Sequence, residues 1–304
     1  MKVWIAHENG RDAIGELPDG VLVETFAGKG EYPSSPSDVE FWVPPFLGDL
    51  VSTRPIEDMA GLRVVQLLTA GAEVWTPVVP RGVALCNGKG VHSAATAEWA
   101  VTAAVASLRG FDVFARAQQR GEWAYPGPRD TLVGKRVLVV GAGAIGEAIA
   151  RRVVAFDAEP IMVARRARPG VSSVDELPKL LPQADVVVLI VPLTDATRGM
   201  VDAKFLARMS DGALLVNAAR GPVVDTDALL TEARSGRISA ALDVTDPEPL
   251  PPENELWSLP NVLITPHVGG STYGLIERAY SLVGRQLRRY AKGEPLENVV
   301  VGDY

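Results

Sequence analysis

The stretch Arg136-Val-Leu-Val-Val-Gly141-Ala-Gly143-Ala144-Ile145-Gly146 decides the fold of this chain. Its first five residues are typical of a buried strand, and residues 147–156 continue with apolar residues at helical spacing. Gly141 permits a tight strand-to-helix turn, Gly143 lets the backbone approach a pyrophosphate, and Gly146 lets the helix pack against the strand. Three spaced glycines alone are weak evidence, but this context predicts a dinucleotide-binding unit.

Composition sets limits on the class of protein. With 304 residues, 47% hydrophobic and 22% charged, the chain has the make-up of a globular protein with room for two domains. A net charge of -7 argues against nucleic acid or an anionic membrane as the main partner. The single cysteine, Cys86, lies in an apolar run and is predicted to be a buried packing residue. Neither a signal peptide nor a membrane span is recognisable, so we expect a cytoplasmic protein, and we expect no metal site.

The first third of the chain alternates short apolar runs with Pro- and Gly-rich breakers, which predicts a small open parallel sheet. The predicted strands are Lys2–Ala6, Val21–Glu24, Val39–Val43, Arg63–Leu68 and Val83–Cys86. A long helical pattern then runs from Ser93 to about Gln119 and leads into a second domain.

The second domain has the rhythm of a doubly wound parallel sheet. Its predicted strands are Val137–Val140, Pro160–Ala164, Asp185–Val191, Ala213–Asn217, Ser239–Val244 and Val262–Thr265. Its predicted helices are Glu147–Phe156, Ala203–Met209 and Thr226–Arg234, with Gly236 placed to end the last. A final helix, about Ser271 to Tyr290, is too long for this rhythm, so we expect it to cross back and bring the tail Asn298–Val301 to the first domain. The predicted arrangement is α/β, with a dinucleotide-binding domain of residues 94–278 inserted into a smaller domain of residues 1–93 and 279–304.

Three polar side chains follow successive predicted strands of the second domain: Arg220, Glu248 and His267. Because the carboxyl ends of parallel strands form the ligand-binding edge, we expect these side chains to converge beside the cofactor. Hydride transfer to a carbonyl needs such a set. Histidine exchanges the proton, arginine binds a carboxylate and polarises the carbonyl, and the carboxylate orients the imidazole and favours its protonated form.

Each of these residues also has a simpler interpretation. Arg220 could satisfy loop carbonyls, and His267 could be a packed histidine. Glu248 could be solvated, with Asp246 as the rival partner of the histidine. The two other histidines of the chain lack such surroundings. The joint placement of the three groups after strands of one nucleotide sheet favours a functional site.

At these motifs the sequence resembles the D-isomer-specific 2-hydroxyacid dehydrogenases. The resemblance runs from Gln66-Leu-Leu-Thr-Ala-Gly-Ala72 to Gly293-Glu-Pro-Leu-Glu-Asn-Val299. The motifs that carry it are Thr96-Ala-Glu98, the glycine motif, Val191-Pro-Leu-Thr194, Asn217-Ala-Ala-Arg-Gly221, Leu242-Asp-Val244 with Glu248-Pro249, and Thr265-Pro-His-Val-Gly-Gly-Ser-Thr272. It implies a Rossmann domain inserted in a flavodoxin-like substrate domain, and usually a homodimer.

The resemblance also implies residue roles. Arg220, Glu248 and His267 would be the catalytic residues. Backbone N–H groups around Ala70 and Gly71, together with Arg220, would hold the substrate carboxylate. The cofactor would be contacted by Gly141, Gly143, Ala144, Ile145, Gly146, Val191, Pro192, Ala218, Arg220, His267 and Gly269, with Asp243 on the nicotinamide carboxamide and Thr96 against the nicotinamide. This chain departs from the family in having Thr245 where an aromatic residue is usual, which would change packing near the site more than the chemistry.

The loop after the second strand of the nucleotide sheet predicts a preference for NADP(H). An acid that binds the ribose hydroxyls is expected about 20 residues past the glycines, but that position is Ala164 here. Without this carboxylate a 2′-phosphate is not repelled, and Arg165 can bind it first, with Arg166 or Arg168 assisting. The alternative is a solvated basic turn and an enzyme that accepts NADP(H) and NAD(H) alike.

The predicted function is that of a D-2-hydroxyacid dehydrogenase that reduces a 2-keto acid such as glyoxylate, hydroxypyruvate or a relative. Two alternatives share the fold: a nucleotide-sensing, co-repressor-like binding protein, and a dehydrogenase of an inorganic oxyanion such as phosphite. The complete arginine, glutamate and histidine set argues against a pure sensor. The substrate loops would decide between the two enzymes.

Overall fold

The computed structural model describes residues 1–46 and 53–301. The chain divides into two compact units, Met1–His92 with Thr272–Tyr304, and Ser93–Ser271. The return to the first unit comes earlier in the chain than the expected boundary at 279, because the whole of α9 (Leu275–Ala291) belongs to that unit. Among others, Ala279, Tyr280 and Val283 of α9 pack into the core of the first unit.

The first unit is built on a five-stranded parallel sheet in the order β2-β1-β3-β4-β5. This is the flavodoxin-like order, so the expected small parallel sheet is confirmed. The strands are β1 (Lys2–Ile5), β2 (Leu22–Thr25), β3 (Val39–Val43), β4 (Val64–Gln66) and β5 (Ala84–Cys86), and two short helices are α1 (Arg11–Ile14) and α2 (Pro55–Asp58).

The C-terminal tail returns to this sheet as expected. Val299 forms an antiparallel bridge with Cys86, and the Val300 N–H donates to the Leu85 carbonyl at 2.8 Å. Cys86 is fully buried, and burial raises its pKa to about 11. The thiol is therefore protonated at neutral pH, which fits the expected packing role.

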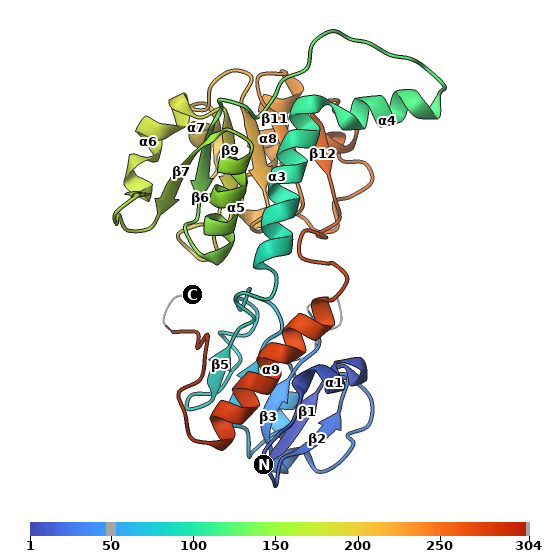
Figure 1. Ribbon diagram of the computed structural model, residues 1–304, viewed down its shortest axis with the longest axis vertical. Coiled ribbons are helices and arrows are strands. Elements are labelled where there is room, and N and C mark those ends of the chain that lie inside the picture. The colour runs from blue at the N-terminus through green and yellow to red at the C-terminus, as the bar shows by residue number, and fades with distance from the viewer. Residues whose placement is uncertain (47–52, 302–304) are drawn as a thin grey trace. The chain divides into compact units, whose positions relative to one another are not determined.

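The second unit contains a seven-stranded parallel sheet in the order β12-β11-β10-β9-β6-β7-β8 (Figure 1). The strands are β6 (Arg136–Val140), β7 (Glu159–Ala164), β8 (Val171–Ser173), β9 (Val186–Leu189), β10 (Leu214–Asn217), β11 (Ser239–Leu242) and β12 (Val262–Ile264). Counted within the unit, this is the doubly wound order 3-2-1-4-5-6 with one further strand. Alternate residues of β6 enter separate cores, Leu138 on one face and Val139 on the other, as a sheet covered on both faces requires.

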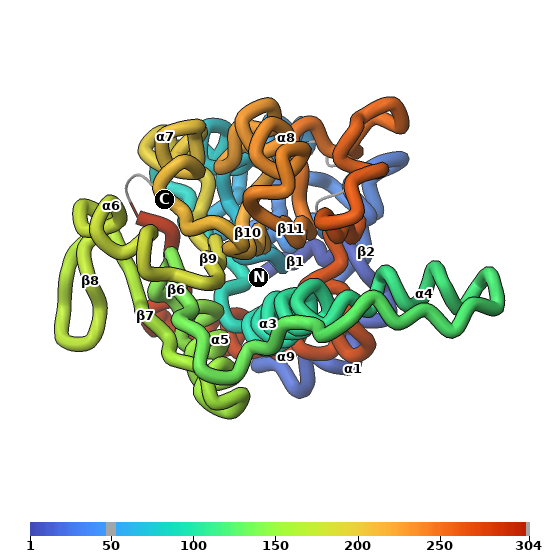
Figure 2. Tube along the Cα trace, turned by 90° about the horizontal axis from the view of Figure 1, so that it is seen from above, coloured from blue at the N-terminus to red at the C-terminus, as the bar shows by residue number. Residues whose placement is uncertain are grey.

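Helices of the second unit cover these faces: α3 (Ser93–Arg109), α5 (Ala144–Ala155), α6 (Leu177–Leu180), α7 (Ala203–Leu206) and α8 (Thr226–Arg234). The helix α4 (Phe111–Gln119) follows α3 and contributes no residue to these cores. The single helix expected from Ser93 to Gln119 is wrong, because Gly110 adopts a left-handed conformation with φ of 64° and splits it. Figures 1 and 2 show α4 leaving the direction of α3 and extending away from the sheet of its own unit. Among the described residues, no helix has the length and apolar character that crossing a membrane requires.

Candidate active site

The glycine turn between β6 and α5 has the shape that the sequence predicts. A Cβ added to Gly146 would overlap the carbonyl oxygen of Gly141, and one added to Gly141 would lie 2.5 Å from the Ile190 carbonyl oxygen. At Gly143, in contrast, a Cβ would meet no protein atom within 4 Å. Two glycines therefore allow close packing within the unit, while the third leaves open space beside the start of α5.

That open space suits a pyrophosphate. The helix α5 begins at Ala144, three residues before the expected start, with Gly143 as its N-cap and no side-chain hydrogen bond to the cap. The first N–H groups of a helix lack acceptors within the helix, and they carry the positive end of its dipole. Ala144, Ile145 and Gly146 supply these groups here, so the residues fit a dinucleotide.

Several other predicted cofactor residues lie at this edge of the sheet. β6 and β9 are neighbours, yet the chain passes from β6 to β7 on the opposite side, which makes their junction the topological switch point. Val191 and Pro192 follow β9, and Ala218 follows β10 with its N–H donating to the Leu189 carbonyl at 3.2 Å. Thr96 lies buried in the first turn of α3.

Asp243, directly after β11, organises the loop that carries the histidine. Its buried carboxylate accepts hydrogen bonds from the Thr265 hydroxyl at 2.6 Å, the Val268 N–H at 2.9 Å and the Gly269 N–H at 2.7 Å. A Cβ at Gly269 would lie 2.7 Å from this carboxylate and 3.4 Å from Trp99. A carboxylate offers about four acceptor sites, so one remains for a donor from a ligand.

His267 and Glu248 form a pair. The imidazole Nδ1 lies 2.7 Å from Glu248 Oε1, and both side chains are close to half-exposed. The backbone of His267 is left-handed, with φ of 53°, and its N–H lies 2.8 Å from the Asp243 carbonyl oxygen. Asp246, the rival partner, is exposed, and its backbone carbonyl accepts from the Thr226 hydroxyl.

The surroundings of Glu248 favour its charged form. Burial alone would raise the pKa of this carboxyl group. The hydrogen bond and charge of His267 oppose that effect, and a backbone bond from Thr245 and the charge of Arg220 act in the same direction. The net result is a pKa below the usual value for glutamate. The carboxylate is therefore available at neutral pH to hold Nδ1.

Arg220 lies in a loop that packs closely on this region. The Asn217 side chain bridges the loop by donating to the Arg220 carbonyl at 3.2 Å and accepting the Ala219 N–H at 3.0 Å. A Cβ at Gly221 would overlap the Thr245 carbonyl oxygen, so only glycine permits this approach of the loops after β10 and β11. The guanidinium also donates to the Ala219 carbonyl at 2.7 Å.

Thr245, which stands where an aromatic residue is usual in the family, is buried. Its hydroxyl donates to the Pro247 carbonyl at 2.9 Å. This hydrogen bond lies within the segment that joins Asp243 to Glu248. A local hydrogen bond therefore holds this side chain, and the expected effect on packing stays a prediction.

The three arginines of the basic loop after β7 have different surroundings. Arg165 and Arg166 are exposed and, within the part of the chain that the structure describes, have no hydrogen-bond or ion-pair partner. Arg168 instead donates to the Ala142 carbonyl at 2.6 Å and lies 4.0 Å from a Glu147 carboxylate oxygen. Arg168 therefore ties the basic loop to the glycine turn, a contact that the sequence did not reveal.

The remaining predicted residues, Ala70 and Gly71, lie in the first unit, in the loop after β4. Gly71 is buried, and its N–H has no acceptor among residues 1–46 and 53–301. Buried N–H groups are rarely left unpaired, so this group is suited to an anionic ligand.

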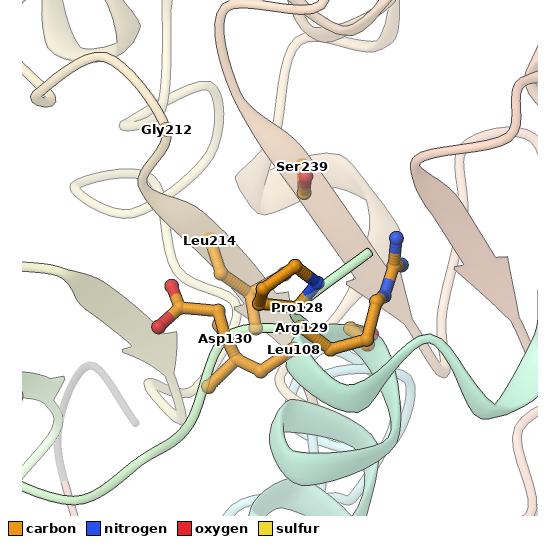
Figure 3. Close-up of a pocket in the computed structure, with 8 residues that line it drawn as sticks. Leu108, Pro128, Arg129, Asp130, Gly212, Leu214 and Ser239 are labelled. Carbon is orange, nitrogen blue, oxygen red and sulfur yellow. The ribbon is translucent and has the colours of Figure 1, made fainter. Parts of the chain in front are cut away.

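A cavity of about 230 Å³ in the second unit lies away from these residues. Figure 3 shows Leu214 and Ser239, the first residues of β10 and β11, near Arg129. These are the amino ends of the strands, whereas Arg220, Glu248 and His267 follow the carboxyl ends. A neighbouring cavity of about 440 Å³ shares Ser107, Arg129 and Ser239 with it. Across the described residues, no group of three or more His, Cys, Asp or Glu side chains could hold a metal ion.

Comparison with known families decides the assignment of the chain. The family described as "D-isomer specific 2-hydroxyacid dehydrogenase, NAD binding domain" matches residues 101–269. A glyoxylate reductase of Thermococcus kodakarensis is 33% identical over 314 residues, which cover 96% of this chain and 94% of the relative. This chain belongs to the D-isomer-specific 2-hydroxyacid dehydrogenase family.

Solved structures of the family agree with the fold. A D-isomer-specific 2-hydroxyacid dehydrogenase from Xanthobacter autotrophicus Py2, in complex with NADPH and MES, is 30% identical with a TM-score of 0.84, covering 99% of this chain and 97% of that one. An NADPH-dependent glyoxylate/hydroxypyruvate reductase from Sinorhizobium meliloti, in complex with NADP and sulfate, is 26% identical with a TM-score of 0.84 and covers 98% of both chains.

Membership of this family makes the protein an NAD(P)-dependent oxidoreductase that transfers a hydride between a nicotinamide cofactor and a small 2-keto or 2-hydroxy acid. The comparisons do not favour the sensor or the oxyanion dehydrogenase. The sequence motifs predict the residues at the carboxyl edge. The same motifs do not reveal the hydrogen bond from Thr265 to Asp243, or the position of Trp99 close to Gly269. Both depend on how segments that are distant in sequence pack together.

Proposed function

We propose that the protein reduces a small 2-keto acid, such as glyoxylate or hydroxypyruvate, to the 2-hydroxy acid, with D configuration where the product is chiral. The observation that carries this proposal is the 2.7 Å pair of His267 and Glu248 at the carboxyl edge of the nucleotide sheet. The glyoxylate reductases among the relatives support this class of substrate.

In this proposal the three polar side chains divide the chemistry. A reduced nicotinamide cofactor, when bound, supplies the hydride. Since Glu248 holds Nδ1 of His267, the other ring nitrogen, Nε2, is the one that donates a proton to the substrate oxygen. Arg220 binds the carboxylate and polarises the carbonyl through its fork of N–H donors.

Other residues hold the cofactor and substrate. The remaining acceptor site of Asp243 would take the N–H of the nicotinamide carboxamide, and Thr96 and Gly269 would lie beside the nicotinamide. In the first unit, the backbone N–H groups of Ala70 and Gly71 bind the substrate carboxylate. The N–H of Gly71, which has no acceptor among the described residues, supports this assignment.

We further propose that NADP(H) is preferred over NAD(H). The support is the absence of an acid at Ala164 and the exposure of Arg165 and Arg166, which have no partner in the described part of the chain. Because Arg168 is already bonded to the Ala142 carbonyl, Arg165 and Arg166 are the residues available for the 2′-phosphate. The S. meliloti relative is described as NADPH-dependent.

The test is a panel of 2-keto acids assayed with NADPH and with NADH in the wild type and in Arg165→Ala. We expect turnover of glyoxylate or hydroxypyruvate, a higher kcat/KM with NADPH, and a loss of that preference in the variant. Absence of turnover across the panel would refute the proposed activity. A wild-type preference for NADH, or an unchanged preference in Arg165→Ala, would refute only the cofactor assignment.

We also propose a homodimer, built on α4 and the segment that follows it. Phe111, Trp123 and Tyr125 are 55%, 101% and 79% exposed, and no residue of α4 belongs to the two apolar cores found among the described residues of its unit. Helices shorter than about 12–15 residues are marginally stable alone in water. A second copy would cover these aromatic side chains, and isologous pairing would bring the larger cavity at the base of α4 into the interface. The expected cytoplasmic location stays a prediction, which cell fractionation would test.

A further inference from the structure

The loop after β4 is held to the first unit through its carbonyl groups. The Gly88 N–H donates to the Thr69 carbonyl at 2.7 Å, the Asn87 side-chain amide donates to the Ala70 carbonyl at 2.9 Å, and the Thr69 hydroxyl donates to the Gly71 carbonyl at 3.0 Å. Three successive carbonyl oxygens of the loop therefore have donors from within the unit.

The hydrogen bond at the Ala70 carbonyl also sets the direction of the Gly71 N–H, because both groups belong to one planar peptide. In a trans peptide the C=O and the following N–H point in opposite directions, and the cis bonds of the described chain lie elsewhere, before Pro247 and Pro249. Because Asn87 holds the Ala70 carbonyl, the N–H of Gly71 must point away from Asn87. This is the N–H that lacks an acceptor among the described residues.

The side-chain amide and the backbone groups of Asn87 all form hydrogen bonds. Its side-chain oxygen accepts the Lys89 N–H at 3.1 Å, so the amide nitrogen must be the atom that faces the Ala70 carbonyl. Its backbone N–H donates to the Asn298 carbonyl at 3.0 Å, and its backbone carbonyl accepts from Gln66 at 3.2 Å. Asn87 is 8% exposed, so its orientation is set before any ligand binds.

Gln66 extends this support to α9. The Gln286 amide donates to the Gln66 side-chain oxygen at 2.7 Å, and both glutamines are fully buried. Buried polar networks whose members are all satisfied are rigid. The loop thus rests on a chain of hydrogen bonds that runs from α9 to the Ala70 carbonyl.

We infer that Asn87 is a positioning residue for the substrate carboxylate: by holding the Ala70 carbonyl it aims the Gly71 N–H at the ligand. This inference rests on the proposed function, in which Ala70 and Gly71 bind the carboxylate. Asn87 itself does not touch the substrate. Asn87 acts on substrate binding only by orienting the loop, and it affects only the binding of the substrate's carboxylate.

The test uses Asn87→Asp, which keeps the size of the side chain and replaces its donor by an acceptor that repels the Ala70 carbonyl. We measure KM and kcat for glyoxylate with NADPH, and the Kd of NADPH by fluorescence. Since hydrogen bonds to charged groups are worth one to two powers of ten in binding, KM should rise by about 10- to 100-fold. The change in kcat should be much smaller, because the variant weakens the binding of the substrate and of the transition state equally. The Kd of NADPH should not change, because the variant acts on the carboxylate of the substrate.

The matched control is Asn298→Asp. Asn298 makes the same kind of bond to a neighbouring carbonyl, from its side-chain amide to Lys89 at 3.0 Å. Its hydrogen bond with Asn87 joins backbone atoms, which the substitution keeps. It should leave KM near the wild-type value. If Asn87→Asp fails to fold, the uncharged Asn87→Ala, which has no side-chain donor, must raise KM in the same way.

Two results would overturn the inference while the wild type remains active: an unchanged KM in the Asn87 variants, or an equal rise in Asn298→Asp, which would mean general damage to the unit. A wild type that reduces no 2-keto acid would instead overturn the proposed function. The two failures are therefore distinguishable.

Discussion

At the scale of single residues, the pair of Glu248 and His267 predicts how the proposed reaction depends on pH. The depressed pKa of Glu248 means that its carboxylate stays charged to a lower pH than a free glutamate. Any stability or orientation that the charged pair provides is present above the unfolded pKa of glutamate and is lost as the pH falls through the lower folded value. The carboxylate of Glu248 is therefore charged at neutral pH, where the proposed reduction would need a protonated imidazole.

Glu248→Gln should displace the pH profile of keto-acid reduction. Without the carboxylate the imidazolium loses a favourable neighbour, so the decline of kcat/KM at alkaline pH should move to lower pH. The measurement is kcat/KM against pH with glyoxylate and NADPH. Asp246→Asn removes an exposed carboxylate two residues away and should leave the profile in place. A profile that moves in Asp246→Asn and not in Glu248→Gln would reverse the assignment of the histidine's partner.

At the scale of secondary-structure elements, the glycine turn has a packing role and a proposed binding role that substitutions can separate. Gly146→Ala places a Cβ against the Gly141 carbonyl oxygen, and overpacking of this kind costs about 1–3 kcal/mol, so Tm should fall. Gly143→Ala meets no protein atom within 4 Å, so Tm should be unchanged. It should nevertheless weaken NADPH binding about tenfold or more, which corresponds to about 1.4 kcal/mol.

Thermal denaturation and fluorescence titration of the two glycine variants check this separation. Equal losses of Tm in both variants would show that Gly143 also has a packing role. Unchanged NADPH binding in Gly143→Ala would place the pyrophosphate elsewhere.

The elements themselves are largely predictable from sequence, because apolar periodicity and turn residues are local signals. The patterns predict every strand of the two sheets except β8, a three-residue strand too short to show alternation. They also miss the break at Gly110, since the helical spacing of apolar residues continues across it. The contacts of Asp243 with Thr265, Val268 and Gly269 join residues 22 to 26 positions apart, and no local pattern encodes them.

The loop after β4 shows the same difference between local signals, which sequence reveals, and long-range contacts, which it does not. The motif around Ala70 and Gly71 identifies it by resemblance, but the support from Asn87, Gln66 and Gln286 is visible only when strands, α9 and tail are packed together. Sequence therefore indicates the proposed ligand-binding groups more readily than the residues that hold them in place.

At the scale of the whole molecule, the exposed aromatic residues after α4 predict the oligomeric state. Truncation of an aromatic residue at the centre of an interface typically costs about 2 kcal/mol or more in binding. Replacing Trp123 and Tyr125 together by alanine should therefore dissociate the proposed homodimer at micromolar concentration. Sedimentation velocity measures this, with Tyr273→Ala as the control because Tyr273 is equally exposed but lies outside the α4 region. A monomeric wild type, or a dimer that persists in the double variant, would contradict the proposed interface.

The most direct test of the account is the turnover of glyoxylate with NADPH by His267→Ala. If His267 donates the proton, kcat should fall by roughly 10²–10⁴-fold. The Kd of NADPH should stay near the wild-type value, because the glycine turn and the basic loop are untouched. Near-normal turnover by this variant would contradict the assignment of His267 as the proton donor, and with it the reaction that we derive from the carboxyl edge of this sheet.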